Sequence, residues 1–326
     1  MTNGAVGRRK KRARAALFRR ILPTAGVLFC MALFLRDPAL SGNAVRKGLE
    51  LAAKNLIPAV FPFLVLSDLL LSAGGIPAWS TLPFGRLLRL PAAGAQAVLL
   101  GWLCGFPVGA QCAIRALEDG ALTRSEAERA IAAASVPSPA FLLGAVGMGL
   151  FRDRTIGLFT EGAVLLAALL ICRLSGLFSR DRCARAEQTA APAPRGSFAE
   201  RLTLSIRKAA SVALNLTAFV VFFAAVSAAA GAVLTRFGAG EDLCAALVCL
   251  LELSGGTAGA AALPDPRVAF LLTVGAAGWS GLSVCFQIAS VCEGSGARMG
   301  RYLLFKSAQC LLCVCFAALF LLVFRR

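Results

Sequence analysis

Long apolar segments recur along almost the whole chain, and they constrain its fold more than any other feature of the sequence. A helix of about 20 apolar residues crosses the roughly 30 Å hydrocarbon core of a bilayer. Because 58% of the 326 residues are apolar and only 16% are charged, the composition excludes an ordinary soluble enzyme and a disordered chain. We therefore expect an all-α polytopic membrane protein with about eight membrane helices. The expected segments are 21–35, 44–73, 93–117, 129–150, 155–178, 201–235, 243–262, 267–292 and 302–324.

The first segment, 21–35, admits two interpretations. It is short for a bilayer core and follows basic residues, and Ala39-Leu40-Ser41 is a passable cleavage context for a signal peptide. We prefer a short first helix, because the rest of the chain is membrane-embedded in character and does not look secreted.

The formal net charge of +17 is concentrated in three places. Residues 1–20 hold eight basic residues, residues 180–208 hold seven more, and the chain ends in Arg325-Arg326. The positive-inside rule explains this distribution better than nucleic-acid binding does. It places both termini in the cytoplasm and makes the number of crossings even. The expected organisation is a basic cytoplasmic N-terminus (1–20), a first membrane half (21–178), a polar cytoplasmic linker (179–200) and a second membrane half (201–326).

The two membrane halves resemble each other in sequence. One correspondence, with an offset of 160 positions, joins Asn55, Phe63 and Ser67 to Asn215, Phe223 and Ser227. A second joins segment 101–111 to segment 275–287. If the first helix spans the membrane, Arg46-Lys47 lies outside and Arg207-Lys208 lies inside. Equivalent elements then enter from opposite sides, which predicts an inverted repeat of the kind that transporters use.

Proline and glycine interrupt several of the apolar segments. Pro58 and Pro62 predict a re-entrant hairpin or an unwound helix within 44–73. Further interruptions are expected at 105–109 (Gly-Phe-Pro-Val-Gly), at 137–139 (Pro-Ser-Pro) and at 279–283 (Trp-Ser-Gly-Leu-Ser), each beside a polar side chain. An interrupted helix exposes backbone N–H groups that suit carboxylate or phosphate ligands. For 105–109 the alternative is close helix packing through a GxxxG pattern.

Ionisable residues inside membrane segments are costly, so each is a functional candidate. The sequence offers Asp68, Glu161 and Glu252. For each, a role in binding a substrate, proton or ion stands against a structural hydrogen bond or, for Asp68 and Glu161, a wet position near an interface. The mixed-charge stretch 115–129 is expected to be a solvated connection, with Thr123 and Glu126 capping the next helix.

Several classes of chemistry are excluded or unsupported. The chain has no histidine, so His-dependent catalysis and His-ligated metal sites are excluded. It has no phosphate-binding loop of the GxxxxGK[ST] type. Most of the twelve cysteines lie in apolar runs, and Cys310, Cys313 and Cys315 have no second cluster to complete a metal site. We therefore expect neither an enzyme nor a bound metal or cofactor.

A set of motifs in a fixed order carries a resemblance to a known family. They are 55–63 (Asn-Leu-Ile-Pro with Phe-Pro-Phe), 105–110, 122–129, 137–139, Leu251-Glu252 and 281–284 with Gln287. Over roughly residues 40–320 the chain resembles the nucleoside-recognition ("gate") domain family, and more narrowly its sporulation integral membrane members. It departs from the family at 136–138 (Val-Pro-Ser), where an Asn is common, and at Cys285, where a His is common.

The resemblance implies a core similar to that of concentrative nucleoside transporters, with paired hairpins and broken helices. It also implies passage of dipicolinic acid from mother cell to forespore, in the outer forespore membrane or the cell membrane. Helix N-termini near 105–109 and 278–283 would bind the two carboxylates. The expected binding residues are Gly105, Pro107, Gly109, Gln111, Ser138, Glu252, Ser280, Gly281, Ser283 and Gln287, with Asn55 and Asp68 as further polar intramembrane residues.

The role of Glu252 stays open between coupling protons and holding an unwound segment by accepting backbone N–H bonds. Two other functions also stay open, a nucleoside or nucleobase transporter and a non-transporting membrane scaffold in spore assembly. The expected partners are a small anionic substrate and the lipid bilayer, without nucleic acid. A homo-oligomer and the form of energy coupling are not decided by the sequence.

Overall fold

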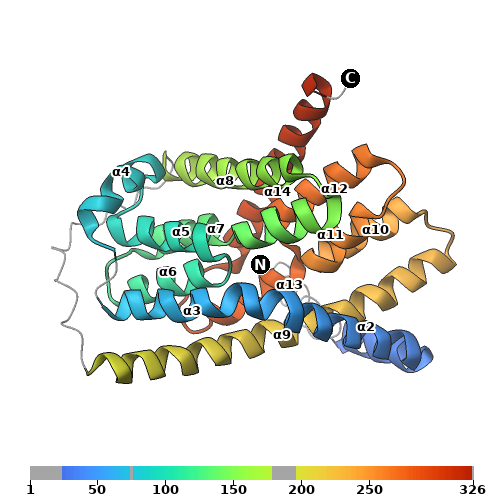
Figure 1. The fold of residues 1–326 in the computed structure, drawn as a ribbon, viewed down its shortest axis with the longest axis horizontal. Coiled ribbons are helices and arrows are strands. Elements are labelled where there is room, and N and C mark those ends of the chain that lie inside the picture. Colours follow the sequence, from blue (N-terminus) through green and yellow to red (C-terminus); the bar gives the residue numbers. More distant parts are fainter. Residues whose placement is uncertain (1–23, 74–75, 178–195, 325–326) are drawn as a thin grey trace, which may run out of the picture.

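The computed structural model describes residues 24–73, 76–177 and 196–324 (Figure 1). Every regular element in these ranges is a helix, so the all-α expectation is confirmed for them. The expected basic N-terminus (1–20) and most of the expected linker (179–200) lie outside the described residues. A helix at Thr24–Arg36 precedes α2 (Pro38–Leu51), η1 (Ala52–Leu56), α3 (Ile57–Ser72), α4 (Ala78–Leu88), α5 (Ala92–Cys104), α6 (Val108–Glu118), α7 (Arg124–Ala134), η2 (Ala140–Phe151), α8 (Arg154–Leu177), α9 (Phe198–Arg236), α10 (Glu241–Leu251), α11 (Leu253–Ala261), α12 (Pro266–Trp279), α13 (Gly281–Val291) and α14 (Met299–Phe324).

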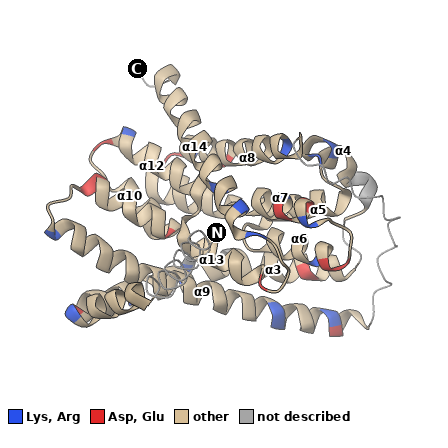
Figure 2. Ribbon diagram, turned by 180° about the vertical axis from the view of Figure 1, so that it is seen from behind, with Lys and Arg blue, Asp and Glu red and all other residues tan. Residues whose placement is uncertain are grey.

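Four of the described helices are long and apolar enough to cross a membrane: α8, α9, α12 with α13, and α14. The number rises to six if each of two strongly bent helix pairs counts as one span. Uncharged stretches dominate α8, α9 and α14 (Figure 2), as burial in lipid requires. The chain is thus a multi-pass membrane protein, but the described part contains fewer spans than the eight expected.

Two of the expected spans fold back on themselves, which accounts for part of this difference. Segment 93–117 forms the hairpin α5–α6, in which a Cβ atom added at Gly109 would lie 2.8 Å from the α-carbon of Gly101. Segment 243–262 forms the hairpin α10–α11, in which a Cβ atom added at Gly256 would lie 2.5 Å from the α-carbon of Cys249. Gly109 is therefore closely packed, because only a hydrogen atom fits at the position of its side chain.

The expected hairpin or unwound helix at Pro58 and Pro62 is wrong. Residues 38–72 follow one helical path through both prolines, and the only irregularity is the π-helical turn η1 just before Pro58. A proline ring clashes with the carbonyl four residues earlier, and a wider turn is one way to accommodate it. Asn55 lies in η1, and its side chain is outside the described residues.

The two membrane halves share one core. Ring centroids of Phe159 on α8 lie 5.4 Å from Phe270 on α12 and 4.5 Å from Phe320 on α14. On the other side of the molecule, α9 lies along α2 and α3 (Figure 1). Ser197 caps α9 in a capping box with Glu200, so the second half begins inside the expected linker. Elements that are distant in sequence can therefore meet in the middle.

The stretch 115–129 is a solvated connection only in its first part, where Arg115 and segment 118–121 are exposed. Thr123 and Glu126 do form a capping box at the start of α7, as the sequence predicts. However, Glu126, Glu128 and Arg129 are all buried. The Glu128 carboxyl group accepts bonds from the Arg301 guanidinium (2.7 Å) and from the backbone N–H of Arg298 (2.9 Å). These charges thus attach α7 to the start of α14.

Candidate functional site

The first half contributes one pair of helix interruptions. Gly105, with φ of +79°, ends α5 at the tip of the first hairpin. Residues 135–139 separate α7 from η2. The backbone N–H of Phe106 donates to the carbonyl of Val136 (3.1 Å), and a Cβ atom on Gly105 would lie 2.9 Å from the backbone nitrogen of Ser138. The two interruptions are therefore in direct backbone contact.

The second half contributes a matching pair. Glu252 stands alone between α10 and α11 at the tip of the second hairpin. Ser280, with φ of +71°, separates α12 from α13, and Gly281, the first residue of α13, has φ of +84°. A Cβ atom on Gly281 would lie 3.0 Å from the backbone nitrogen of Leu253. Again the tip of a hairpin packs against a broken helix.

A tryptophan joins hairpin and broken helix in each half. The indole N–H of Trp102, on the first hairpin, donates to the carbonyl of Ala133 (2.9 Å). The indole N–H of Trp279, on the broken helix, donates to the carbonyl of Leu250 (3.0 Å). Both acceptors are the last residue but one of a helix, where carbonyls have no partner within the helix. The indoles therefore donate hydrogen bonds to carbonyl groups that the helix interruptions leave without a partner.

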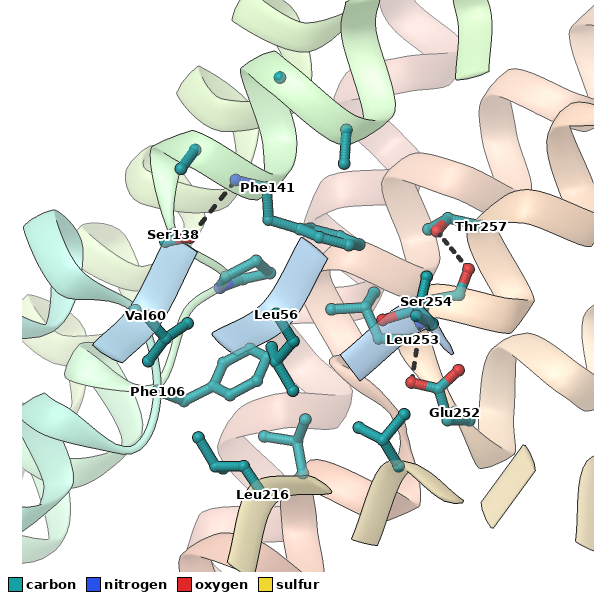
Figure 3. A pocket seen from close by; sticks show the side chains of 18 of the residues that line it. Leu56, Val60, Phe106, Ser138, Phe141, Leu216, Glu252, Leu253, Ser254 and Thr257 are labelled. Atoms are coloured by element: carbon teal, nitrogen blue, oxygen red, sulfur yellow. Dashed lines mark hydrogen bonds between the residues drawn. The ribbon is translucent and has the colours of Figure 1, made fainter. Parts of the chain in front are cut away.

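A cavity of about 550 Å³ lies where the two pairs of interruptions meet (Figure 3). This volume falls in the usual range for small-molecule sites. The first half lines it with Cys104, Gly105, Phe106, Pro137, Ser138, Ala140 and Phe141, and the second half with segment 252–254, Thr257, Val284 and Gln287. Leu56, Val60, Leu216 and Val220 contribute apolar side chains from α3, α9 and η1.

The polar groups of the cavity wall are few. Glu252 is the only charged side chain among the described lining residues. It accepts bonds from the backbone N–H groups of Ser254 (2.9 Å) and Gly255 and thereby caps α11. Gln287 is 3% exposed; its amide nitrogen donates to Ser283 Oγ (3.3 Å), while its Oε1 has no partner among the described residues. A buried acceptor without a partner is costly, so Gln287 has bonding capacity for a ligand.

The structure brings together four of the expected binding residues, since Gly105, Ser138, Glu252 and Gln287 all line the cavity. Ser138 Oγ accepts a bond from the N–H of Phe141 (3.3 Å). Ser280, Gly281 and Ser283 lie directly behind this wall. Gly281 packs on Glu252, Ser283 binds Gln287, and the fully buried Ser280 donates to the carbonyl of Ala277 (3.3 Å).

Other expected residues lie away from the cavity lining. Pro107 and Gly109 belong to the first hairpin, and Gln111 is half-buried on α6. Asp68 bonds to Ser205 Oγ (2.7 Å) and Lys208 Nζ (3.1 Å), so it connects α3 to α9. Glu161 is half-buried on α8 and is also outside the lining.

Sequence reasoning missed a buried cation, Lys306. Its side chain is fully buried on α14, and its Nζ donates to the carbonyl of Ser135 (2.9 Å) and to Gln309 Oε1 (2.8 Å). Gln309 in turn donates to the carbonyl of Val164 (3.1 Å). The signal was present, because Lys306 lies within the expected segment 302–324. It was overlooked because a lysine near the start of a membrane helix looks like an interfacial residue.

Comparison with known proteins gives one partial match. No family model matches the chain, and no solved structure matches it. Over 164 residues the chain is 30% identical to the "Sporulation integral membrane protein YlbJ" of Bacillus subtilis (strain 168). The match covers 49% of this chain and 39% of the relative, so the chain spans about two fifths of the length of the curated relative that it matches. The similarity to a sporulation integral membrane protein is confirmed to this extent, whereas the wider gate-domain family stays a prediction.

Proposed function

We propose that the chain is a carrier for a small planar aromatic dicarboxylate, dipicolinic acid, and moves it from mother cell toward forespore during sporulation. The observation that carries the proposal is the cavity that lies between two pairs of helix interruptions. Irregular backbone at membrane depth is tolerated only inside protein or around a water-filled cavity. Broken helices around a central site are the usual architecture of secondary transporters. The partial similarity to a sporulation protein supplies the cellular setting.

The cavity wall suits an aromatic ring with polar substituents. Phe106 and Phe141 are large apolar lining residues from the first half (Figure 3). The partial positive charge at the start of η2, beside Ser138, suits a carboxylate group. The carboxamide of Gln287 can present its oxygen or its nitrogen to a ligand by rotation about its last bond. Apolar faces with a few polar groups are typical of small-molecule sites.

Alternating access is the mechanism that the element order favours. The first half runs hairpin α5–α6, broken helix α7–η2 and long helix α8. The second half runs hairpin α10–α11, broken helix α12–α13 and long helix α14. This order suggests a repeat that aligns hairpin with hairpin. The sequence correspondence between 101–111 and 275–287 instead pairs a hairpin with Pro266–Val291, which counts as one candidate membrane span. We propose that the two repeats move against each other around the cavity, with both termini in the cytoplasm.

A nucleoside or nucleobase transporter is the second candidate. Glu252 favours it, because a carboxylate in the cavity accepts hydrogen bonds from the N–H groups of a base or the hydroxyl groups of ribose. A dianion carries no such donors. The two candidates therefore differ in whether the ligand gives hydrogen bonds to the second-half wall.

Transport by the purified full chain in liposomes tests the proposal. Radiolabelled dipicolinate is added outside, with proton or sodium gradients imposed in separate samples. We expect saturable uptake that unlabelled dipicolinate inhibits and uridine does not. Uptake of uridine without uptake of dipicolinate would support the second candidate, and uptake of neither would leave the scaffold interpretation.

A further inference from the structure

The four interruptions expose helix ends with partial charges of both signs. At each break the preceding helix presents carbonyl groups and a partial negative charge, and the following helix presents N–H groups and a partial positive charge. Left alone, the two ends at one break oppose each other. The sign that dominates at the cavity then depends on which helix end has its partial charge offset by a bonded side chain.

In the first half a cation binds the negative, C-terminal end of α7. Lys306 Nζ donates to the carbonyl of Ser135, the C-cap residue of α7. The four salt bridges found among the described residues do not include Lys306. Its other bond goes to the neutral Gln309. The charge of Lys306 is therefore not offset by a carboxylate partner, and it offsets the negative end of α7. The positive end of η2, beside Ser138, is left dominant.

In the second half an acidic side chain binds the positive, N-terminal end of α11. Glu252 caps α11 by accepting two of its first N–H groups and is 4% exposed. The bonded side chain therefore offsets a negative helix end in the first half and a positive helix end in the second. Figure 3 shows the consequence for the wall, since Ser138 and Phe141 lie on one side of the cavity and Glu252 and Ser254 on the other.

We propose that Lys306 and Glu252 polarise the cavity, so that a bound organic anion places its carboxylates against the first-half wall, at Gly105 and Ser138. The uncharged edge of the ligand then faces Glu252. This inference rests on the proposed carrier function and adds the orientation and the source of selectivity for an anion. Lys306 acts as a positioning residue, because it binds the backbone behind the wall and does not line the cavity. The unpartnered Oε1 of Gln287 independently indicates a ligand in the same space.

Binding of dipicolinate to the purified full chain tests the role of Lys306. Each variant is also measured with pyridine-2,6-dicarboxamide, a neutral analogue of the same shape. We expect Lys306→Met to weaken dipicolinate binding about tenfold, the effect of a charge at a buried helix end, and to change binding of the diamide less than about threefold. Lys306→Arg should restore the preference for the dianion. Lys54→Met, which removes an exposed lysine paired with Glu50, should leave both constants unchanged.

Orientation is tested with two matched serines. Ser138 and Ser254 both line the cavity near the start of a helix, one in each half. An aspartate is tolerated at such positions. We expect Ser138→Asp to weaken dipicolinate binding at least about tenfold more than Ser254→Asp does, because it places its charge where the carboxylates bind.

The outcomes distinguish a failure of the carrier function from a failure of the polarised cavity. If the wild-type chain binds no dipicolinate, the proposed function fails. If it binds dipicolinate but Lys306→Met keeps the wild-type ratio of the two constants, the polarised cavity is refuted while the carrier function stands. Should Lys306→Met fail to fold, equal losses in Ser138→Asp and Ser254→Asp would refute the orientation by themselves.

Discussion

The α-carbon of Glu252 lies 3.2 Å from the point that a Cβ atom on Gly281 would occupy. Gly281 also has φ of +84°, where a side chain is strained. We therefore expect Gly281→Ala to destabilise the protein by roughly 1–3 kcal/mol and to reduce transport, because the tip of the second hairpin has to move. Thermal unfolding in detergent measures the first effect and liposome uptake the second. Gly259→Ala on α11, where the added Cβ atom meets nothing within 4 Å, should be close to neutral in both assays.

The tryptophan bonds give a second prediction. Trp102→Phe keeps most of the ring contact with Phe84 but removes the donor to the Ala133 carbonyl. We expect a loss of about 1–2 kcal/mol in stability, the cost of a buried acceptor left without its partner. Trp279→Phe should cost less, under about 1 kcal/mol, because the bond from its indole to the Leu250 carbonyl is exposed. Unchanged melting temperatures for both variants would contradict the role given to these bonds.

Gln287 separates a carrier from a membrane scaffold. Gln287→Leu is close to isosteric, removes the polar group from the cavity wall and leaves the packing of α13 intact. We expect spore dipicolinate to fall at least about tenfold, with normal amounts of folded protein in the membrane. Gln111→Leu is the matched control, because Gln111 is half-buried on α6 and outside the cavity lining. Wild-type spore dipicolinate in Gln287→Leu would favour the scaffold.

Asp68 is expected to be structural, although its place in an apolar segment made it a functional candidate. Its carboxyl group bonds to Ser205 and Lys208 on α9, and the Lys208 side chain is 48% exposed. A pair of this kind contributes about 0–1 kcal/mol. Asp68→Asn should therefore lower stability slightly and leave uptake within about twofold of wild type. A loss of uptake as large as that of Gln287→Leu would contradict this assignment.

Glu128 should matter more for stability than its place in a charged stretch suggests. Its side chain is 4% exposed and bonds to Arg301 and to the backbone of Arg298. We expect Glu128→Ala to cost about 3 kcal/mol, because it leaves charged and polar groups without partners. Glu50→Ala, which breaks the exposed pair with Lys54, should change stability by less than about 0.5 kcal/mol. Chemical denaturation of the two variants in parallel gives the comparison.

The sequence predicted the helix interruptions better than it predicted the path of the chain. Gly105, Pro137 and Gly281 have local conformational causes that are readable without a fold, and interruptions occur at all three. The hairpin turn after Gly105 depends instead on the close approach of Gly109 to α5, which is a tertiary contact. Pro58 and Pro62 were misleading because the helix continues through both: Pro58 follows the π-helical turn η1, and Pro62 lies inside α3. The burial of Glu128 and Lys306 depends on partners about 170 positions away, which local patterns do not contain.

Lys306 also constrains the order in which the protein can be assembled. On a helix newly inserted in lipid, Lys306 has one side-chain acceptor on its own helix, Gln309, and its charge is costly there. Its acceptor outside α14, the carbonyl of Ser135, becomes available only where α7 stops short of η2. During synthesis α14 leaves the ribosome long after α7. The last steps of biogenesis are therefore coupled to the earlier ones, since α14 reaches its final depth only against a first half that has already formed its gap at 135–139.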